Sequence, residues 1–312
     1  MDTPADLPQH PTPRVALKYA KGGNAMRIVT YNIQFGRGKD GRVDLERIAA
    51  EVEGADLIAM QEVDRLWTRS GMVDQVAELV RLLPGYHWRY GPGIDLDLGE
   101  EPGGLDARRR QFGNLLLVRA PIVSSRNHLL PKIGFADQLS LQRSALEGVI
   151  ACPSGPVRFY SVHLAHISSL ERQRQAARIM EIHAEAANEG GAWSGGKDRP
   201  DWLADGPPPP MPGAAVLMGD FNMEPTTPEY EIIAGPATHK YGPAATLGGF
   251  ADAWLAAGND PAGGLTKPAE TGDRRIDFVF VATPLAERIG AARIDDRAQG
   301  SDHQPLWVEI DL

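Results

Sequence analysis

The alternation of apolar and polar residues along the chain predicts more strands than helices. Short apolar runs that stop at glycine, proline or polar residues are typical of buried strands. Helices are expected between these runs, and the combination predicts an α/β fold of two packed sheets covered by helices. The runs lie at 26–33, 55–63, 112–122, 144–152, 157–164, 214–222, 274–282 and 305–312.

Helical periodicity is clearest in three segments. Apolar residues at 45, 48, 49 and 52 follow the spacing of one face of a helix, and those at 76, 79, 80 and 83 do the same. Ser168 and Glu171 form a capping box that predicts the start of a long helix ending near Ala187. Two shorter helices are expected at 228–235 and 250–258.

Two segments do not follow these patterns. Residues 1–25 are polar and rich in proline, and they lack the apolar core of a signal peptide, so we expect a disordered extension. Residues 188–213 are rich in glycine and proline but contain two tryptophans, which fits either a flexible insertion or a flap that shapes a site. Residues 26–312 otherwise show no linker-like break, which predicts a single domain.

The composition is that of a globular protein that can bury a large core. Hydrophobic residues make up 42% of the 312 residues and charged residues 23%. No run approaches the ~18 apolar residues of a membrane span. Cys152 is the only cysteine, which excludes an internal disulfide and a cysteine zinc cluster and favours a reducing, cytoplasmic setting.

The formal net charge of −9 argues against a protein that holds long nucleic acid, because such binding depends on neutralising phosphates. The densest basic cluster, residues 108–110, follows an acidic stretch. This charge does not argue against a small phosphate-bearing substrate that is held locally by a metal ion.

Polar side chains occur at the ends of apolar runs in six places. A single carboxylate in such a position is usually a turn former or a helix cap, and a single histidine is usually a core residue. Six together indicate that these groups partner one another around a common ion and substrate, because buried polar groups need partners. Carboxylates and amides without thiolates suit Mg²⁺ or Mn²⁺ better than zinc. The residues are Asn32, Gln34, Glu62, His163, Asp220, Asn222, Asp277, Asp302 and His303.

Six short motifs occur in a fixed order over residues 26–312 and together resemble a known family. They are TYNI, QEV, VHL, GDFN, RIDFVF and SDHQPL. The chain resembles the endonuclease/exonuclease/phosphatase superfamily of metal-dependent phosphohydrolases. That superfamily includes type I DNase, abasic-site endonucleases, inositol polyphosphate 5-phosphatases and neutral sphingomyelinases. The resemblance implies a four-layer α/β sandwich, in which two mostly antiparallel sheets are flanked by helices and the site lies at one edge of both sheets.

The resemblance also implies roles for individual residues. Glu62 and Asp302 match metal-binding carboxylates, and Asn32 matches an amide that orients the metal and the phosphate. Asp220 would orient or deprotonate the attacking water, and Asn222 would donate a hydrogen bond to a phosphate oxygen.

The histidines complete the implied site. His303 would bind the phosphate, with Asp277 holding its ring, and His163 would contact the scissile phosphate. Arg143 could reach a phosphate or could equally be a solvated arginine at a strand start. His166 could reach the site or cap the following helix.

The implied reaction is in-line attack of water on phosphorus, with Mg²⁺ as the expected cofactor and Mn²⁺ as the alternative. Where several nucleases of the superfamily carry an acid, this chain has Gln34, which disfavours a second tightly held ion.

A phosphodiesterase acting on a small or lipid-derived phosphoester is the leading hypothesis, and no protein partner is predicted. The first alternative is an abasic-site endonuclease or exonuclease that contacts nucleic acid through residues 108–110. The second is a binding protein that has lost the chemistry, although Glu62, His163, Asp220, Asn222, Asp277, Asp302 and His303 are all present. One scaffold serves many phosphoesters, so substrate choice is expected to depend on the loops at 91–111 and 188–213.

Overall fold

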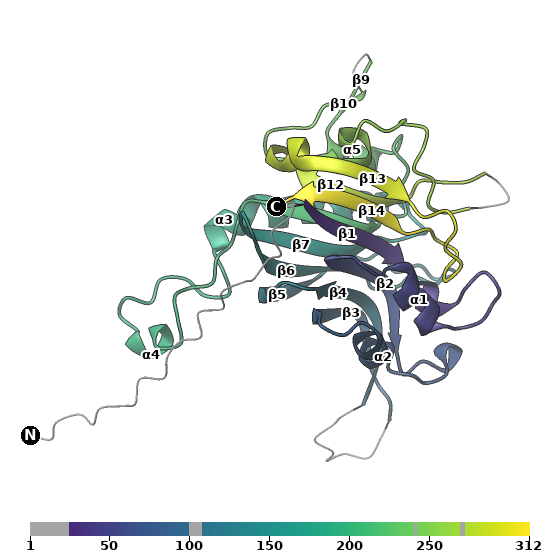
Figure 1. Cartoon of the computed structure of the whole chain (residues 1–312), viewed down its shortest axis with the longest axis horizontal. Coiled ribbons are helices and arrows are strands. Elements are labelled where there is room, and N and C mark those ends of the chain that lie inside the picture. Colours follow the sequence, from purple (N-terminus) through teal and green to yellow (C-terminus); the bar gives the residue numbers. More distant parts are fainter. Residues whose placement is uncertain (1–24, 100–107, 240–241, 269–271) are drawn as a thin grey trace, which may run out of the picture.

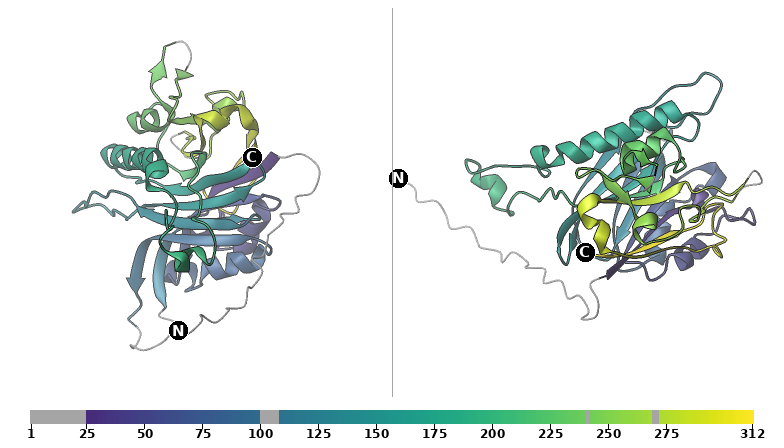
Figure 2. Two further views of the ribbon diagram at one scale, coloured as in Figure 1. Left: turned by 90° about the vertical axis from the view of Figure 1, so that its left-hand side faces the viewer. Right: turned by 90° about the horizontal axis from the view of Figure 1, so that it is seen from above.

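The computed structural model describes residues 25–99, 108–239, 242–268 and 272–312. Two six-stranded sheets pack face to face, and helices cover their outer faces (Figures 1 and 2). This arrangement confirms the predicted α/β sandwich. The extension expected at residues 1–25 lies outside the described residues, except for Ala25, which begins strand β1. No helix in the described part of the chain is long and apolar enough to cross a membrane.

The first sheet has the strand order β13-β14-β1-β2-β4-β3. Strands β1 and β2 are parallel, and the other neighbouring pairs are antiparallel. The strands are β1 (Ala25–Asn32), β2 (Leu57–Arg65), β3 (His87–Asp97), β4 (Arg109–Val118), β13 (Ile289–Ile294) and β14 (Leu306–Asp311).

The second sheet has the order β11-β12-β8-β7-β6-β5. Its one parallel pair is β7 with β8. A separate two-stranded ribbon joins β9 (Ala237–Thr238) to β10 (Gly242–Pro243). The strands of the large sheet are β5 (Ile122–Leu129), β6 (Ser144–Cys152), β7 (Gly155–His163), β8 (Ala215–Asp220), β11 (Phe250–Asp252) and β12 (Asp277–Ala282).

Among the described residues, four helices begin at a residue whose side chain caps them, and the other two begin at a proline. The Ser168 hydroxyl accepts a hydrogen bond from the backbone N–H of Glu171, as the capping box predicts. Asp44 and Asp74 cap two further helices in the same way. The helices are α1 (Leu45–Glu51), α2 (Gln75–Leu82), α3 (Ser169–Glu189), α4 (Pro200–Leu203), α5 (Pro228–Ala234) and α6 (Ala253–Ala256), with 3₁₀ turns η1 (Gln34–Gly36), η2 (Thr68–Ser70) and η3 (Thr283–Arg288).

Three apolar cores hold the layers together. The central core lies between the sheets, where Leu116 of β4 and Phe159 of β7 are fully buried. A second core joins the first sheet to α1 and α2, and a third joins the second sheet to α3 and α5. Burial of these faces is the main driving force for the fold, because the hydrophobic effect scales with the apolar area removed from water.

Strand direction explains why the polar strand ends meet. Asn32 pairs with Gln61 at the carboxyl end of the parallel pair β1–β2, and His163 pairs with Asp220 at the carboxyl end of β7–β8. Strand β12 runs antiparallel to β8, so its first residue, Asp277, lies opposite Asp220. One edge of the sandwich therefore collects polar side chains from both sheets.

Strands β3, β5 and β13 have no counterpart among the predicted elements, and all three lie at sheet edges. The burial of β5 alternates between intermediate and exposed positions, so its sequence lacks an apolar run. The expected strand 112–122 also breaks at 119–121, between β4 and β5.

The helix expected at 250–258 is partly wrong. Phe250 instead pairs with Ala282 in strand β11, and the helix begins only at Ala253. The Asp252 side chain accepts the backbone N–H of Trp254 and so fixes the start of α6.

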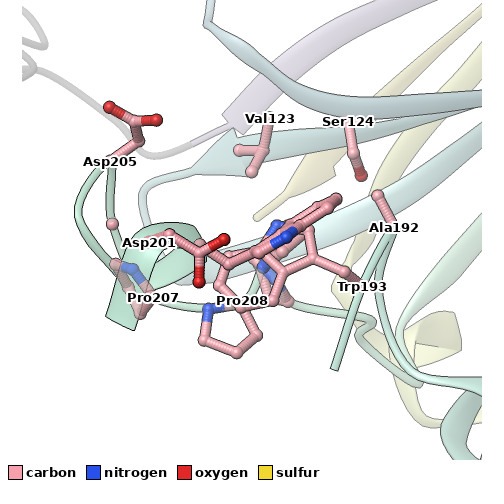
Figure 3. Close-up of a pocket in the computed structure, with 12 residues that line it drawn as sticks. Val123, Ser124, Ala192, Trp193, Asp201, Asp205, Pro207 and Pro208 are labelled. Carbon is pink, nitrogen blue, oxygen red and sulfur yellow. The ribbon is translucent and has the colours of Figure 1, made fainter. Parts of the chain in front are cut away.

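The segment 188–213 contains the short helix α4 and lines a cavity of about 810 Å³ (Figure 3). Trp193 and Trp202 pack edge to face in this segment, with their ring centroids 5.9 Å apart. The cavity also touches Ser124, which pairs with Val149 in β6. At ~3.3 Å per residue, Val149 lies roughly 17 Å along β6 from the strand's polar end at Ser144. The segment is therefore at the opposite end of the sandwich from the polar edge, and the flap interpretation is wrong.

Candidate active site

Asp220 ends strand β8 at the centre of the polar edge. A side chain on the preceding residue, Gly219, would place its Cβ 1.9 Å from the carbonyl oxygen of Val162. Glycine is therefore required where β7 and β8 approach each other, directly before the carboxylate. The turn that follows is fixed by a hydrogen bond from the backbone N–H of Asn222 to Asp220 Oδ1, at 2.9 Å.

Three side chains from other elements converge on the second oxygen of Asp220. Asn32 Nδ2 donates to Asp220 Oδ2 at 2.9 Å across the two sheets. His163 Nε2 lies 3.4 Å from the same oxygen and His303 Nε2 lies 3.8 Å from it. Burial raises the pKa of the Asp220 carboxyl to about 6, even though His303 and these hydrogen bonds act in the opposite direction.

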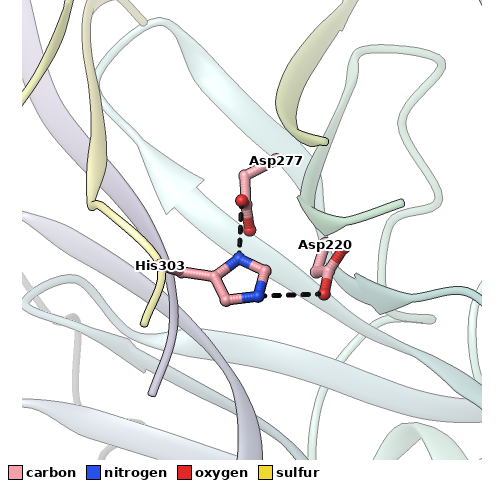
Figure 4. Close-up of side chains that lie close together, drawn as sticks. All are labelled: Asp220, Asp277 and His303. Atoms are coloured by element: carbon pink, nitrogen blue, oxygen red, sulfur yellow. Dashed lines mark hydrogen bonds and ion pairs between the residues drawn. The ribbon is translucent and has the colours of Figure 1, made fainter. Parts of the chain in front are cut away.

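His303 lies between two buried carboxylates (Figure 4). Its Nδ1 is 2.8 Å from Asp277 Oδ2, and its Nε2 faces Asp220. Burial alone would lower the pKa of His303, but the charges of Asp277 and Asp220 outweigh it and raise the pKa to about 9. The ring is therefore an imidazolium at neutral pH, and Asp277 holds its orientation.

His163 is neutral by contrast. Burial lowers its pKa well below the ordinary 6.5, and the charge of Arg143 lowers it further. Arg143 Nη1 is 3.0 Å from His163 Nδ1, and a guanidinium can only donate, so Nδ1 accepts and Nε2 carries the proton. His163 therefore presents an Nε2–H donor on the side of Asp220.

Arg143 is buried beside the polar edge, with 4% of its surface exposed, so the solvated interpretation is wrong. Its other terminal nitrogen, Nη2, lies 3.2 Å from His166 Nδ1, which places His166 beside Arg143. The Nε atom of Arg143 has no hydrogen-bond partner among the described residues. Arg143 thus supports both histidines and retains a positive charge next to the site.

Asn222 adds a second neutral donor. Its Nδ2 donates to the carbonyl of Leu164 at 3.2 Å and lies 3.2 Å from His163 Nε2. Because both of these nitrogens carry hydrogen, neither satisfies the other, and both are available to an acceptor such as a phosphate oxygen.

Glu62 lies on the other side of Asn32, whose Nδ2 is 3.4 Å from Glu62 Oε1. The pairing of β2 with β4 shifts between Met60 and Val63, and Glu62 has φ of 61° in this irregularity. Gln34 and Asn222 also have positive φ, at 45° and 48°. Such strained backbone in non-glycine residues is concentrated at functional sites.

Asp302 and Gln34 form the outer part of the edge. Gln34 Nε2 donates to Asp302 Oδ2 at 3.0 Å, and the Lys267 ammonium forms an ion pair with the same oxygen. The backbone N–H of Gln34 donates to Asn32 Oδ1, so Asn32 turns its amide nitrogen toward Asp220 and Glu62. In this structure, therefore, Asn32 orients carboxylates.

Three residues of the edge escaped the sequence analysis. Ser301 Oγ donates to the carbonyl of Asn32 at 2.7 Å and accepts the backbone N–H of His303, so it fixes the loop before β14. Thr266 Oγ1 accepts the backbone N–H of Asp277 at 3.1 Å. Lys267 follows directly in the chain. Ser301 could have been found from its place beside Asp302, but no pattern marks Thr266 or Lys267.

The sequence matches the profile of the endonuclease/exonuclease/phosphatase family over residues 29–303, which is most of the chain. The chain belongs to this family. Members of the family are hydrolases that act on phosphoesters, and they generally use divalent metals. The resemblance inferred from the motifs is confirmed, and its expected functional residues all lie at the edge described above, with Arg143 and His166 beside them.

Solved structures of the family share the fold. An endonuclease/exonuclease/phosphatase from Bacteroides vulgatus is 20% identical, with a TM-score of 0.60 over 92% of this chain and 99% of that one. One from Beutenbergia cavernae is 22% identical, with a TM-score of 0.58 over 92% and 72%. A mannosyl-6-phosphatase from Bacteroides thetaiotaomicron is 18% identical, with a TM-score of 0.58 over 91% and 99%. No curated protein matches the sequence.

The donor set fits the divalent metal that family members use. Glu62 and Asp302 are partly exposed carboxylates next to the buried Asp220 and offer oxygen ligands, and Asn32 donates its amide N–H to Glu62 and Asp220 beside them. Cys152 lies in the central core, where burial raises the pKa of its thiol to about 12, so no thiolate competes. Asp220, Asp277 and His303 also place ligand atoms within 4.8 Å of one another and could hold a cation. The imidazole, however, already pairs with Asp277.

Proposed function

We propose that this protein is a Mg²⁺-dependent phosphodiesterase that hydrolyses a small or lipid-derived phosphodiester within one catalytic domain, residues 26–312. The observation that carries the proposal is the buried chain Asp277–His303–Asp220 beside Glu62. It joins a carboxylate that can accept a proton, a cationic donor and a metal-binding carboxylate at one edge. Such a combination suits the transfer of a phosphoryl group to water.

Asp220 acts on the attacking water. Its pKa of about 6 makes it ionised at neutral pH and still basic enough to take a proton, which is the compromise that general bases need. Asn32 fixes the carboxylate through its 2.9 Å hydrogen bond. The water would therefore be aligned for in-line attack on phosphorus.

His303, His163 and Asn222 act on the phosphate. The imidazolium of His303 offers a charged donor, and the other two offer neutral donors that do not repel one another. Their hydrogen bonds strengthen as negative charge builds on the phosphoryl oxygens in the transition state. Arg143 keeps His163 in the tautomer that donates from Nε2.

Glu62, with Asp302 and Asn32 close by, would hold Mg²⁺, or Mn²⁺ in its place. When bound, such an ion polarises the ester and stabilises the leaving oxygen. The choice of Mg²⁺ rests on the oxygen-only donor set.

A small substrate is favoured over nucleic acid by charge. The net charge of −9 opposes a polyanion. Within the basic cluster 108–110, Arg109 is already paired with Asp95 at 2.5 Å, and Arg110 lies over the ring of Trp67. Both guanidinium groups therefore already have a partner within the protein, which a nucleic-acid phosphate would have to replace.

We expect the purified protein to hydrolyse bis(p-nitrophenyl) phosphate faster than p-nitrophenyl phosphate in the presence of Mg²⁺, and to leave abasic-site duplex DNA intact. The reason is that the donors described above match one phosphate, whereas the net charge of −9 opposes the binding of a duplex. Initial rates on the three substrates at equal enzyme concentration provide the measurement. Cleavage of the monoester alone would make the protein a phosphatase, and salt-sensitive cleavage of the DNA would make it a nuclease.

A further inference from the structure

Lys267 brings a fixed positive charge to a carboxylate of the active site. Its ammonium pairs with Asp302 Oδ2, the oxygen that also accepts the 3.0 Å hydrogen bond from Gln34 Nε2. The Lys267 side chain is 19% exposed, whereas that of Asp302 is 38% exposed. The accessible carboxylate is therefore bound from one side by a lysine that is largely withdrawn from solvent.

The backbone around Lys267 holds this charge in place. Lys267 and Arg274 exchange backbone hydrogen bonds in both directions, at 2.9 and 3.0 Å. The neighbouring Thr266 is fully buried, and its hydroxyl accepts the backbone N–H groups of Ile276 and Asp277 at the start of β12. The backbone of Lys267 is thus held beside the strand that carries Asp277.

These contacts oppose the binding of a second cation. A divalent ion at Asp302 Oδ2 would have to displace both the ammonium and the Gln34 amide, and an ion at either oxygen of Asp302 would lie close to a like charge. At Glu62, by contrast, the contacts among the described residues are the 3.4 Å hydrogen bond from Asn32 and His163 Nε2 at 4.0 Å, and neither an ammonium nor a guanidinium is hydrogen-bonded to this carboxylate.

We propose that Lys267, together with Gln34, occupies Asp302 and restricts the active site to a single divalent cation at Glu62. Lys267 is in this sense a positioning residue, and the inference rests on the proposed function. It departs from the sequence analysis, in which Asp302 is a metal ligand and Lys267 has no role. The Lys267 ammonium, which is part of the protein, takes the place of the positive charge that a second metal ion would bring to Asp302.

The test is the number of Mn²⁺ ions bound by the full chain, measured by calorimetry and by electron paramagnetic resonance of free Mn²⁺. The wild type is expected to bind one ion. Lys267→Met is expected to bind a second ion and to bind the first about tenfold more tightly, because a nearby like charge is removed. The double variant Lys267→Met/Asp302→Asn is expected to bind one ion again. Lys132→Met removes an exposed lysine and is the control for the loss of charge.

Two ions in the wild type, or an unchanged number and affinity in Lys267→Met with a native circular dichroism spectrum, would overturn the inference. Diester hydrolysis by the same wild-type preparation separates this failure from that of the proposed function. If hydrolysis needs metal while the Mn²⁺ numbers contradict the role of Lys267, only the inference fails. If the wild type neither binds Mn²⁺ nor hydrolyses a phosphoester, both fail.

Discussion

Replacement of Asp220 by asparagine is expected to reduce kcat for the diester about 10³-fold or more while leaving the protein folded. The amide keeps the shape of the side chain but cannot take a proton from water. Burial raises the pKa of Asp220 from its ordinary value of 3.8 to about 6. Ionisation of this carboxyl therefore lowers the stability of the folded state, and the loss begins as the pH rises above 3.8 and is complete above about 6. The neutral variant avoids this cost, so its melting temperature at neutral pH should equal or exceed that of the wild type.

Steady-state kinetics and thermal unfolding of the same preparations provide the measurements. Asp40→Asn is the matched control, since Asp40 forms an exposed ion pair with Arg47 outside the active site, and it should keep wild-type activity. Turnover in Asp220→Asn within a few-fold of the wild type would contradict the assignment of Asp220 as the base. A large drop in melting temperature would instead show that the carboxylate is structural.

Replacement of His303 by glutamine is expected to reduce kcat about 10²- to 10³-fold, because the charged donor to the phosphate is lost. The pH profile should also change. In the wild type, kcat/KM should rise near pH 6 as Asp220 loses its proton and fall near pH 9 as His303 loses its own. The fall near pH 9 should be absent from His303→Gln, since glutamine does not titrate.

Asp277→Asn tests the charge of His303 while the imidazole ring itself stays in place. Asp277 is the main partner that raises the pKa of His303, so its replacement should move the alkaline fall of kcat/KM to lower pH. His128→Gln is the control. His128 lies outside the site, where its Nε2 is 2.9 Å from Glu147 Oε2, and its replacement should leave the pH profile unchanged. An alkaline fall that stays near pH 9 in both His303→Gln and Asp277→Asn would show that another group titrates there.

The buried strands were predictable because their sequences are nearly continuous apolar runs. β8 and β12 are buried at every position, and their polar ends mark the edge where both sheets finish. The register could not be read from the pattern, yet it is the register that places Asp277 opposite Asp220. Knowledge of the family supplied that step, and the fold then brought the expected residues together.

There is a physical reason why the edge strands and the outer part of the site, around Asp302, could not be predicted from the sequence. β13 alternates partial burial with exposure, so its residues carry little hydrophobic signal. Lys267 reaches the site through its ion pair with Asp302, which lies 35 residues further along the chain. A lysine in a polar loop has the same local signature whether it is solvated or buried against a carboxylate. Only the tertiary structure distinguishes the two.

The most direct test of the central claim is hydrolysis of the diester after the metal is removed and restored. The account predicts that EDTA abolishes cleavage, that Mg²⁺ restores it in the wild type, and that Mg²⁺ does not restore it in Glu62→Gln, in which the metal-binding carboxylate is neutral. Full activity in EDTA, or a Glu62→Gln variant that Mg²⁺ restores to the wild-type rate, would contradict the claim that this edge is the active site of a metal-dependent phosphodiesterase.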